Sequence, residues 1–282
     1  RPGMARTRCT LPLLPPPGDR RYLPTGSDVR WDDDGTVSFT GLPPRAWIQV
    51  LTNGRFGFLA TDAGTGHMWH RNAHTGRINR WLCDPWVLRG TETLRMASRA
   101  GAVSLFDDDG AARVEYGFGW AAWERSVDGM SVRVTEFVPE DADARVLLID
   151  GADRLPLIWE LEPALGGKNG ACLCIEEEPG LIRLSSPDSY YPGVQMLIGS
   201  SAELDAETDF IPAALRIKLS AGAETVLCCG CCTGTELREL CVPDTARSLL
   251  NAVSARWARL LGTFSLRCGD SALEHYMNGW AV

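Results

Sequence analysis

The sequence predicts a mainly β protein in which many short strands form a two-sheet antiparallel β-sandwich, followed by linker helices. Between residues 29 and 232 apolar side chains recur mostly at every second position, which is the pattern of half-buried strands. Four Asp-Gly pairs lie between such runs, at residues 34–35, 109–110, 128–129 and 150–151. Because Asp-Gly readily adopts the positive φ values of tight turns, these pairs predict hairpins. After Pro243 the apolar spacing becomes helical.

Composition and period divide the chain into three segments. Residues 1–28 are rich in Pro and Arg and predict a loose lead-in. Residues 29–242 hold the alternating runs, for example Val114 to Trp120 and Leu215 to Leu219. Residues 243–282 have helical periodicity. We therefore expect the sandwich in the second segment and helices in the third.

The third segment predicts two helices. Apolar side chains recur at helical spacing between Asp244 and Leu261, with Asp244 placed to cap the start and Gly262 to end the helix. A second helix is expected to begin at Ser271, which has the spacing of a capping box with Glu274. Its apolar stripe continues without a Gly or Pro stop signal. We therefore expect an excerpt from a longer protein, whose helices associate with a second copy or with further sequence.

Charge and composition exclude several classes of partner. The 282 residues carry a formal net charge of -8 without a long Lys or Arg run, so nucleic acid is not expected as a partner. The apolar runs are shorter than the roughly 20 residues that cross a bilayer, so no membrane insertion by this segment is expected. No signal peptide is recognisable, and the ten dilute cysteines are typical of reduced thiols. We expect a cytoplasmic protein, and a membrane-anchored parent protein stays open.

Tryptophans are concentrated between Trp47 and Trp123, where they are interleaved with Arg, Asn and Asp. Sugar rings present an apolar face and a rim of hydroxyls, so this mixture is typical of carbohydrate sites. Tryptophan also fills sandwich cores, and composition leaves both roles open. The candidates for a carbohydrate-binding or structural cluster are Trp69, Asn72, Arg77, Trp81, Asp84, Trp120 and Trp123. The first five are expected to form one cluster, because an Arg can stack on Trp and pair with Asp.

Three motifs occur in order along residues 30–282. The first combines Trp47-Ile48-Gln49-Val50-Leu51-Thr52-Asn53, Arg55-Phe56-Gly57-Phe58, Asn72-Ala73-His74 and Asp84-Pro85. The second combines Tyr116-Gly117-Phe118-Gly119-Trp120 and Phe137-Val138-Pro139, and the third Ala255-Arg256-Trp257 and Tyr276-Met277-Asn278. Together they resemble the N-terminal domain of glycoside hydrolase family 94, formerly glycosyltransferase family 36. That family holds cellobiose, chitobiose and β-1,2-oligoglucan phosphorylases and the phosphorylase-like part of cyclic β-1,2-glucan synthase, and the Asn72-Ala73-His74 stretch looks nearest to the last.

The resemblance implies a β-supersandwich of galactose-mutarotase type, with residues 243–282 as the linker helix and the start of a truncated (α/α) barrel domain. In the family's phosphorylases an Asp of the barrel protonates the leaving oxygen while inorganic phosphate attacks with inversion. The matching barrel segment is not in this sequence, so no catalytic residue and no activity are expected in the excerpt. No cofactor is implied, and inorganic phosphate would be the co-substrate of the full-length enzyme.

The resemblance also implies a homodimer that acts on a β-glucan or glucoside. In it, a loop reaches the active site of the neighbouring subunit, and the corresponding residues here are Gly166, Gly167, Lys168 and Asn169. This loop is short and lacks the larger polar insert of cellobiose phosphorylase. We expect a non-catalytic, carbohydrate-associated domain of a glycosyltransferase or β-glucoside phosphorylase, and the alternative is a free-standing carbohydrate-binding or scaffolding module.

Other motifs favour structural roles. The run Cys228-Cys229-Gly230-Cys231-Cys232 has zinc-like spacing but no second ligand pair, so buried thiols on a strand are expected and no metal site. His67, His70 and His74 lack an H-E-x-x-H pattern, and Gly64-Thr65-Gly66 lacks the Lys-Ser/Thr of a phosphate loop. Asp62, Asp84 and Glu124 could be proposed as paired acids, but sequence separation does not fix their distances.

Overall fold

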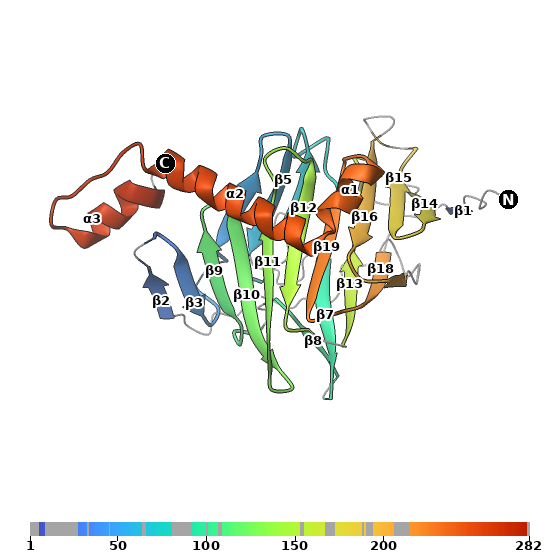
Figure 1. Cartoon of the computed structure of the whole chain (residues 1–282), viewed down its shortest axis with the longest axis horizontal. Coiled ribbons are helices and arrows are strands. Elements are labelled where there is room, and N and C mark those ends of the chain that lie inside the picture. Colours follow the sequence, from blue (N-terminus) through green and yellow to red (C-terminus); the bar gives the residue numbers. More distant parts are fainter. Residues whose placement is uncertain are drawn as a thin grey trace.

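The structure of the chain is a computed structural model (Figure 1). It describes residues 6–8, 28–32, 34–44, 46–63, 66–80, 92–99, 101–106, 109–152, 155–166, 173–187, 189, 194–205 and 215–280. Of the expected lead-in over residues 1–28, only Arg6–Arg8, which form a short strand, and Asp28 are described. The remainder of that prediction lies outside the described residues.

The described strands form three antiparallel sheets, which confirms the predicted mainly β, antiparallel supersandwich class. The largest sheet has, in spatial order, β1 (Arg6–Arg8), β14 (Leu173–Glu178), β15 (Leu181–Ser185), β16 (Gln195–Ser200), β19 (Glu224–Gly230), β12 (Ala144–Asp150), β11 (Met130–Phe137), β10 (Trp120–Val127), β9 (Arg113–Gly117), β3 (Val37–Thr40) and β2 (Asp28–Trp31). The second has β17 (Leu204–Asp205), β18 (Leu215–Ser220), β13 (Pro156–Leu161), β7 (Glu92–Ser98) and β8 (Gly101–Ser104). The third has β4 (Ile48–Thr52), β5 (Phe56–Thr61) and β6 (Gly66–His70).

The layer opposite the large sheet is therefore divided between two smaller sheets, where the sequence had predicted a single second sheet. The segment after β6 is joined to the residues that follow β13 by an isolated bridge between Asn79 and Pro163. No continuous ladder of the described residues connects the two smaller sheets. Alternation within each strand carries no information on which strands pair, so this division could not be expected from the sequence.

Two of the four Asp-Gly pairs occupy hairpins, as predicted: residues 34–35 join β2 to β3, and residues 128–129 join β10 to β11. Asp128 and Gly129 have φ values of 51° and 86°. Gly35, Gly110 and Gly151 also have positive φ. The hairpin prediction is wrong for residues 109–110 and 150–151, which connect strands of different sheets, β8 to β9 and β12 to β13. Their Gly residues still adopt the positive φ that Cβ disfavours, because a change of direction needs it there too.

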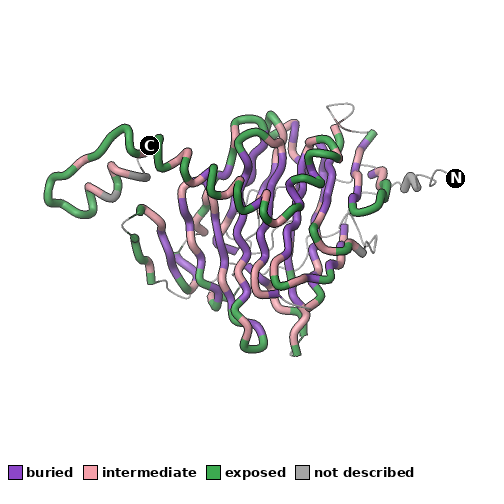
Figure 2. Tube along the Cα trace, viewed as in Figure 1, coloured by how far each residue is buried: buried purple, intermediate pink, exposed green. Residues whose placement is uncertain are grey.

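Two apolar cores lie on the two faces of the large sheet. Along β12, Leu147 and Ile149 point into the core shared with the smaller sheets, whereas Val146 and Leu148 point toward the helices. All of these side chains are buried, which explains why β12 reads as a continuous apolar run and not as an alternation. Figure 2 shows the buried strands in the middle of the molecule and the more exposed helices outside them.

Helices α1 (Gly234–Leu240) and α2 (Pro243–Leu261) cover the second face of the large sheet (Figure 1). The helix predicted after Pro243 is thus confirmed, and it ends at Gly262 as expected. Its predicted N-cap is wrong: Val242 is the N-cap and Asp244 lies in the first turn. Proline is preorganised for the first helical position, which moves the start of the helix, while Asp244 still interacts favourably with the helix dipole.

A third helix, α3 (Ser271–His275), continues into one π-helical turn over Tyr276–Trp280. The predicted Ser271 cap is wrong, because Asp270 caps the helix by accepting from the backbone N–H groups of Ala272 and Leu273. Glu274 instead accepts from the N–H groups of Cys268 and Gly269. The side chain of Glu274 thus fixes the backbone of Cys268 and Gly269, before the helix, and takes no part in its cap.

The apolar stripes of the C-terminal helices are only partly covered. Leu260, Phe264, Leu273 and Tyr276 are exposed, whereas Val253, nearer the middle of α2, is buried against the large sheet. Within the described residues, no helix has the length and apolar character that crossing a bilayer requires.

Candidate functional site

The three-stranded sheet places Trp69 on β6. Gly57 of β5 lies opposite Trp69 in the ladder, and the indole lies across it. A Cβ at Gly57 would be 2.1 Å from Trp69 Cζ2, far inside van der Waals contact. The Gly of the Arg55-Phe56-Gly57-Phe58 motif therefore makes room for the indole, which stays half-buried at the end of the sheet.

Asn72 builds the turn that follows β6. Its Oδ1 accepts hydrogen bonds from the backbone N–H groups of His74 and Thr75, at 2.9 and 2.8 Å, and from Thr75 Oγ1 at 3.0 Å. These are the contacts of a local side-chain turn. The amide oxygen of Asn72 is thus used by the protein itself.

Arg77 lies next to Trp69 through a backbone bridge between the two residues. Arg77 is half-buried, and its Nε is a buried donor without a hydrogen-bond partner among the described residues. Arg77 therefore lies beside Trp69 and is shielded from open solvent. The imidazole of His67 stacks on Trp69 with ring centroids 5.7 Å apart, and burial, reinforced by the charge of Arg77, lowers the pKa of His67.

The segment around Arg77 is joined to the start of the predicted cross-subunit loop. Gly166 donates from its N–H to the carbonyl of Arg77 at 2.6 Å, and Ala164 donates to the carbonyl of Ile78 at 2.7 Å. Leu165, which is buried, has a φ of 44°, a backbone conformation that residues other than Gly rarely adopt. The structure thereby brings together two sets of candidate residues that the sequence treated separately.

Several candidate residues lie outside the described residues. They are Trp81 and Asp84 of the expected cluster, Gly167, Lys168 and Asn169 of the loop, and Gly64 and Thr65. In the sequence, Trp81 follows Arg80 and Gly167 follows Gly166, whose N–H donates to the carbonyl of Arg77. The five-residue cluster stays a prediction.

Trp120 and Trp123 lie on opposite faces of β10, since an odd separation along a strand reverses the side-chain direction. Trp123 is fully buried and donates from Nε1 to the carbonyl of Asp62 at 2.7 Å. Trp120 packs against the helix-side core, and the guanidinium of Arg133 lies 5.9 Å from its ring centroid. Trp123 is therefore a core residue, out of reach of a glycan in solution.

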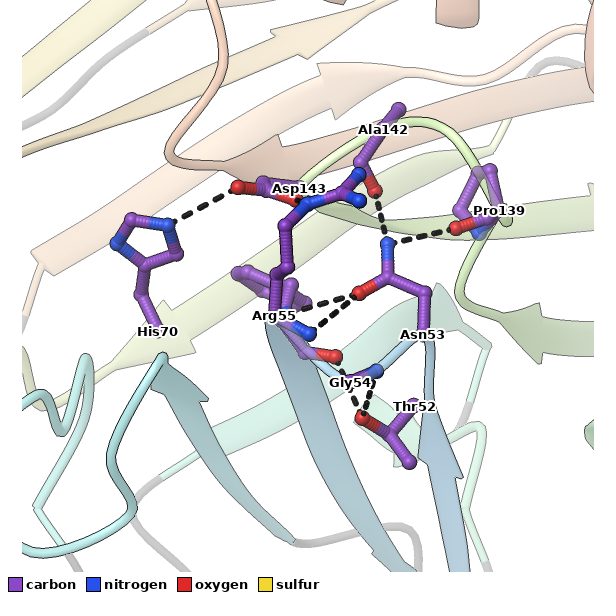
Figure 3. A network of polar contacts seen from close by, with 9 residues as sticks. Thr52, Asn53, Gly54, Arg55, His70, Pro139, Ala142 and Asp143 are labelled. Carbon is purple, nitrogen blue, oxygen red and sulfur yellow. Dashed lines mark hydrogen bonds and ion pairs between the residues drawn. The ribbon is translucent and has the colours of Figure 1, made fainter.

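A polar network that the sequence did not predict holds the three-stranded sheet against the loop between β11 and β12 (Figure 3). The Nδ2 of Asn53 donates to the carbonyls of Pro139 and Ala142, both at 2.9 Å, and its Oδ1 accepts from the N–H groups of Arg55 and Phe56. All four hydrogen bonds join the β4–β5 turn to this loop or close the turn. The only sequence signal was the Asn-Gly pair at 53–54, which marks a turn but not its long-range partners.

Asp143 extends this network toward β6 (Figure 3). One carboxylate oxygen accepts from Arg55 Nε at 2.7 Å, and the other lies 3.0 Å from His70 Nε2. Because His70 is next to Trp69 in β6, the network fixes the strand that carries the candidate aromatic residue.

The remaining motifs have structural positions. Cys228 and Cys229 are fully buried on β19 as predicted, and burial raises the pKa values of their thiols. The prediction is wrong for Cys231 and Cys232, which follow the strand and are half-buried, because β19 ends at Gly230. Asp62 is buried, and Glu124 accepts from Ser131 Oγ. Over the described part of the chain, no group of three or more His, Cys, Asp or Glu side chains is arranged to hold a metal ion.

Comparison with known proteins relates this architecture to a family. Residues 37–150 match the family model described as the supersandwich domain of glycosyl hydrolase 94. The match covers less than half of the chain, so over these residues the chain is similar to a glycosyl hydrolase 94 supersandwich domain. The match includes the three-stranded sheet that carries Trp69 and the network around Asn53, and it confirms the resemblance over these residues. No curated protein sequence matches the chain.

Two solved structures are similar to the chain. One is a bacterial glucoamylase complexed with acarbose, at a TM-score of 0.44 and 6% identity, with 97% of this chain and 42% of that chain covered. The other is a putative kojibiose phosphorylase from human microbiome, at a TM-score of 0.41 and 10% identity, with 95% and 38% covered. The chain spans less than half the length of either structure.

Proposed function

We propose that this chain is the non-catalytic, carbohydrate-associated domain of a glycosyltransferase or β-glucoside phosphorylase that transfers a glucosyl group of β-glucans with inversion. The observation that carries the proposal is the supersandwich match over residues 37–150, since this domain belongs to a family of carbohydrate-active enzymes. In the whole enzyme, inorganic phosphate is the co-substrate, and the catalytic acid is supplied by a barrel that follows the sandwich.

The region around Trp69 and Arg77 is the proposed contact with glycan. A half-buried indole can cover the apolar face of a sugar ring, and a guanidinium donates to hydroxyl oxygens. The buried Arg77 Nε, which has no partner within the described residues, supports this assignment because an unused buried donor is costly unless something accepts from it.

The loop that begins at Gly166 is proposed to extend this contact. The N–H groups of Ala164, Leu165 and Gly166 donate to the carbonyls of Ile78 and Arg77, which fixes the point where the loop begins. In a cytoplasmic homodimer, of the cyclic β-1,2-glucan synthase type or of the phosphorylase type, the loop would meet the neighbouring subunit. The whole enzyme's dimer and its β-glucan specificity are parts of the proposal.

A paired assay of the purified chain tests the function. Sophorose, cellobiose or a longer β-1,2-glucan is titrated calorimetrically, and the same samples receive inorganic phosphate and are assayed for glucose 1-phosphate. We expect heat of binding without product, because a positioned general acid is worth about 10²–10⁴-fold in rate and the family's acid lies outside the supersandwich. Maltose, an α-linked disaccharide of the same size, is the matched control and should bind more weakly.

Either half of the assay can contradict the proposal. Glucose 1-phosphate formed in proportion to the amount of chain would show that the domain is catalytic. Absence of binding to every β-glucan tested, while the chain is folded by circular dichroism, would show that it does not contact the glycan.

A further inference from the structure

A buried ionic triad joins the large sheet to the five-stranded sheet. Arg145 on β12 lies between Glu92 on β7 and Glu136 on β11, and all three side chains have 0% exposure. Arg145 Nη1 donates to both oxygens of Glu92 at 2.7 Å, and Nη2 donates to Glu136 Oε1. The guanidinium also lies 3.7 Å from the ring centroid of Phe58. The triad is thus sealed in the core, away from solvent.

The charges of the triad do not balance. Two carboxylates would face one guanidinium, and the other titratable group that faces it is the Cys229 thiol of β19, which is also buried. Within the described part of the chain, the other elements packed around the triad contribute uncharged groups, namely Phe58, Met68 and Trp159. A buried charge without compensation costs several kcal/mol, and proteins usually avoid it by changing the protonation state.

The hydrogen bonds indicate which carboxyl group carries the extra proton. Glu92 accepts from Arg145 at both oxygens and from Trp159 Nε1 at 2.6 Å, so its charged form is fully satisfied. Glu136 has one oxygen on Arg145, and its Oε2 is buried without a partner in the described part of the chain. Hydrogen bonds to the charged form favour it, so Glu92 is the better anion and Glu136 the better acid.

We propose that folding of this domain takes up one proton at Glu136, so that the contact between the two sheets weakens as the solution becomes more alkaline. The pKa of Glu136 is shifted in the direction that this proposal requires. Burial, together with repulsion from Glu92, raises the pKa of Glu136 from 4.5 to about 7 in spite of the opposing charge of Arg145. Although burial opposes it, the two carboxyl groups hold the pKa of Arg145 above its usual value, so Arg145 stays charged throughout.

The pH dependence follows from linkage. Below pH 4.5 Glu136 is protonated in the folded and in the unfolded chain, and its contribution to stability is complete. Between pH 4.5 and about 7 the unfolded chain loses this proton first, so the equilibrium constant for folding falls by about tenfold per pH unit. Above the folded pKa both forms are ionised and the loss is complete.

Denaturant unfolding of the chain between pH 4.5 and 8, in wild type and in Glu136→Gln, tests the proposal. Glutamine has the shape of the protonated acid and cannot ionise, so we expect the ratio of the two folding constants to change by about tenfold per pH unit in favour of the variant. Glu160→Gln is the matched control. Although burial opposes it, hydrogen bonds from Arg216 and Thr93 hold the pKa of Glu160 below its usual value, so this variant should keep the wild-type decline.

Parallel pH profiles of wild type and Glu136→Gln would overturn the proposal. If Glu136→Gln does not fold, unfolding is followed near pH 6 by calorimetry in buffers of different ionisation enthalpy, in a His67→Gln background that removes the proton uptake of this buried imidazole on unfolding. Release of a proton on unfolding supports the uptake at Glu136, and Glu160→Gln should release the same amount. Absence of release, or uptake on unfolding, overturns it.

Discussion

Single polar side chains hold the small sheet that carries Trp69. Asn53 uses both ends of its amide, because Nδ2 donates to two carbonyls and Oδ1 accepts from two N–H groups. Asn72 differs, since the described hydrogen bonds of its side chain are all accepted by Oδ1. The two asparagines therefore provide a matched pair in which the same substitution has different consequences.

Asn53→Asp is expected to lower the free energy of unfolding by about 2 kcal/mol or more, because a carboxylate oxygen would replace the donor that faces Pro139 and Ala142. Asn72→Asp keeps every acceptor contact and should change stability by less than about 0.5 kcal/mol. Chemical denaturation at neutral pH measures both. Equal effects of the two substitutions would contradict the assigned roles.

Residue types fixed by local geometry were predictable from the sequence, and residues with distant partners were not. Asp128 and Gly129 form a turn through their own backbone conformation, without distant partners. By contrast, Asp143 meets His70 across a long stretch of chain, and Glu92 meets Arg145 in another sheet. No spacing rule relates such residues, which is why the network around Asn53 and the buried triad were found only in the structure.

Helix α1 links the last strand of the large sheet to α2 and was not predicted. It has only 7 residues, and its buried apolar side chains are Leu237 and Leu240. Two such positions are too few to show a helical period. Its start is nevertheless well defined, because Thr233 and Glu236 form a complete capping box. The length of α2 made its period visible, whereas the Pro243 start showed that a cap cannot be located from residue type alone.

Thr233→Ala is expected to cost about 1 kcal/mol of unfolding free energy, because the first turn of α1 loses its side-chain acceptor. Thr235→Ala, within the same helix and exposed, is the control and should be neutral or slightly stabilising, since Ala is the better helix former. Hydrogen exchange of the α1 amides should increase only in the first variant. Equal exchange in both would show that the capping box does not hold the helix.

The molecule as a whole combines a fold class that was predictable with a sheet arrangement that was not. The change from period two to helical spacing after Pro243 located the start of α2, although the last strand already ends at Gly230 and α1 lies between them. The order of eleven strands in the large sheet depends on non-local pairing, such as β16 beside β19, and the sequence patterns do not encode it directly. The first two family motifs lie within the matched residues 37–150, and they indicated the supersandwich class, which periodicity alone does not distinguish from other sandwiches.

The proposed glycan contact is tested most directly through the indole N–H signals of the tryptophans. In a titration of isotope-labelled chain with a β-1,2-gluco-oligosaccharide, we expect the Trp69 signal to shift, since its ring is half-buried beside Arg77. The Trp123 signal should stay unchanged, because its N–H is bonded to Asp62 in the core. Binding of the oligosaccharide with no shift at Trp69, or with shifts confined to the exposed Trp31 on β2, would contradict the account.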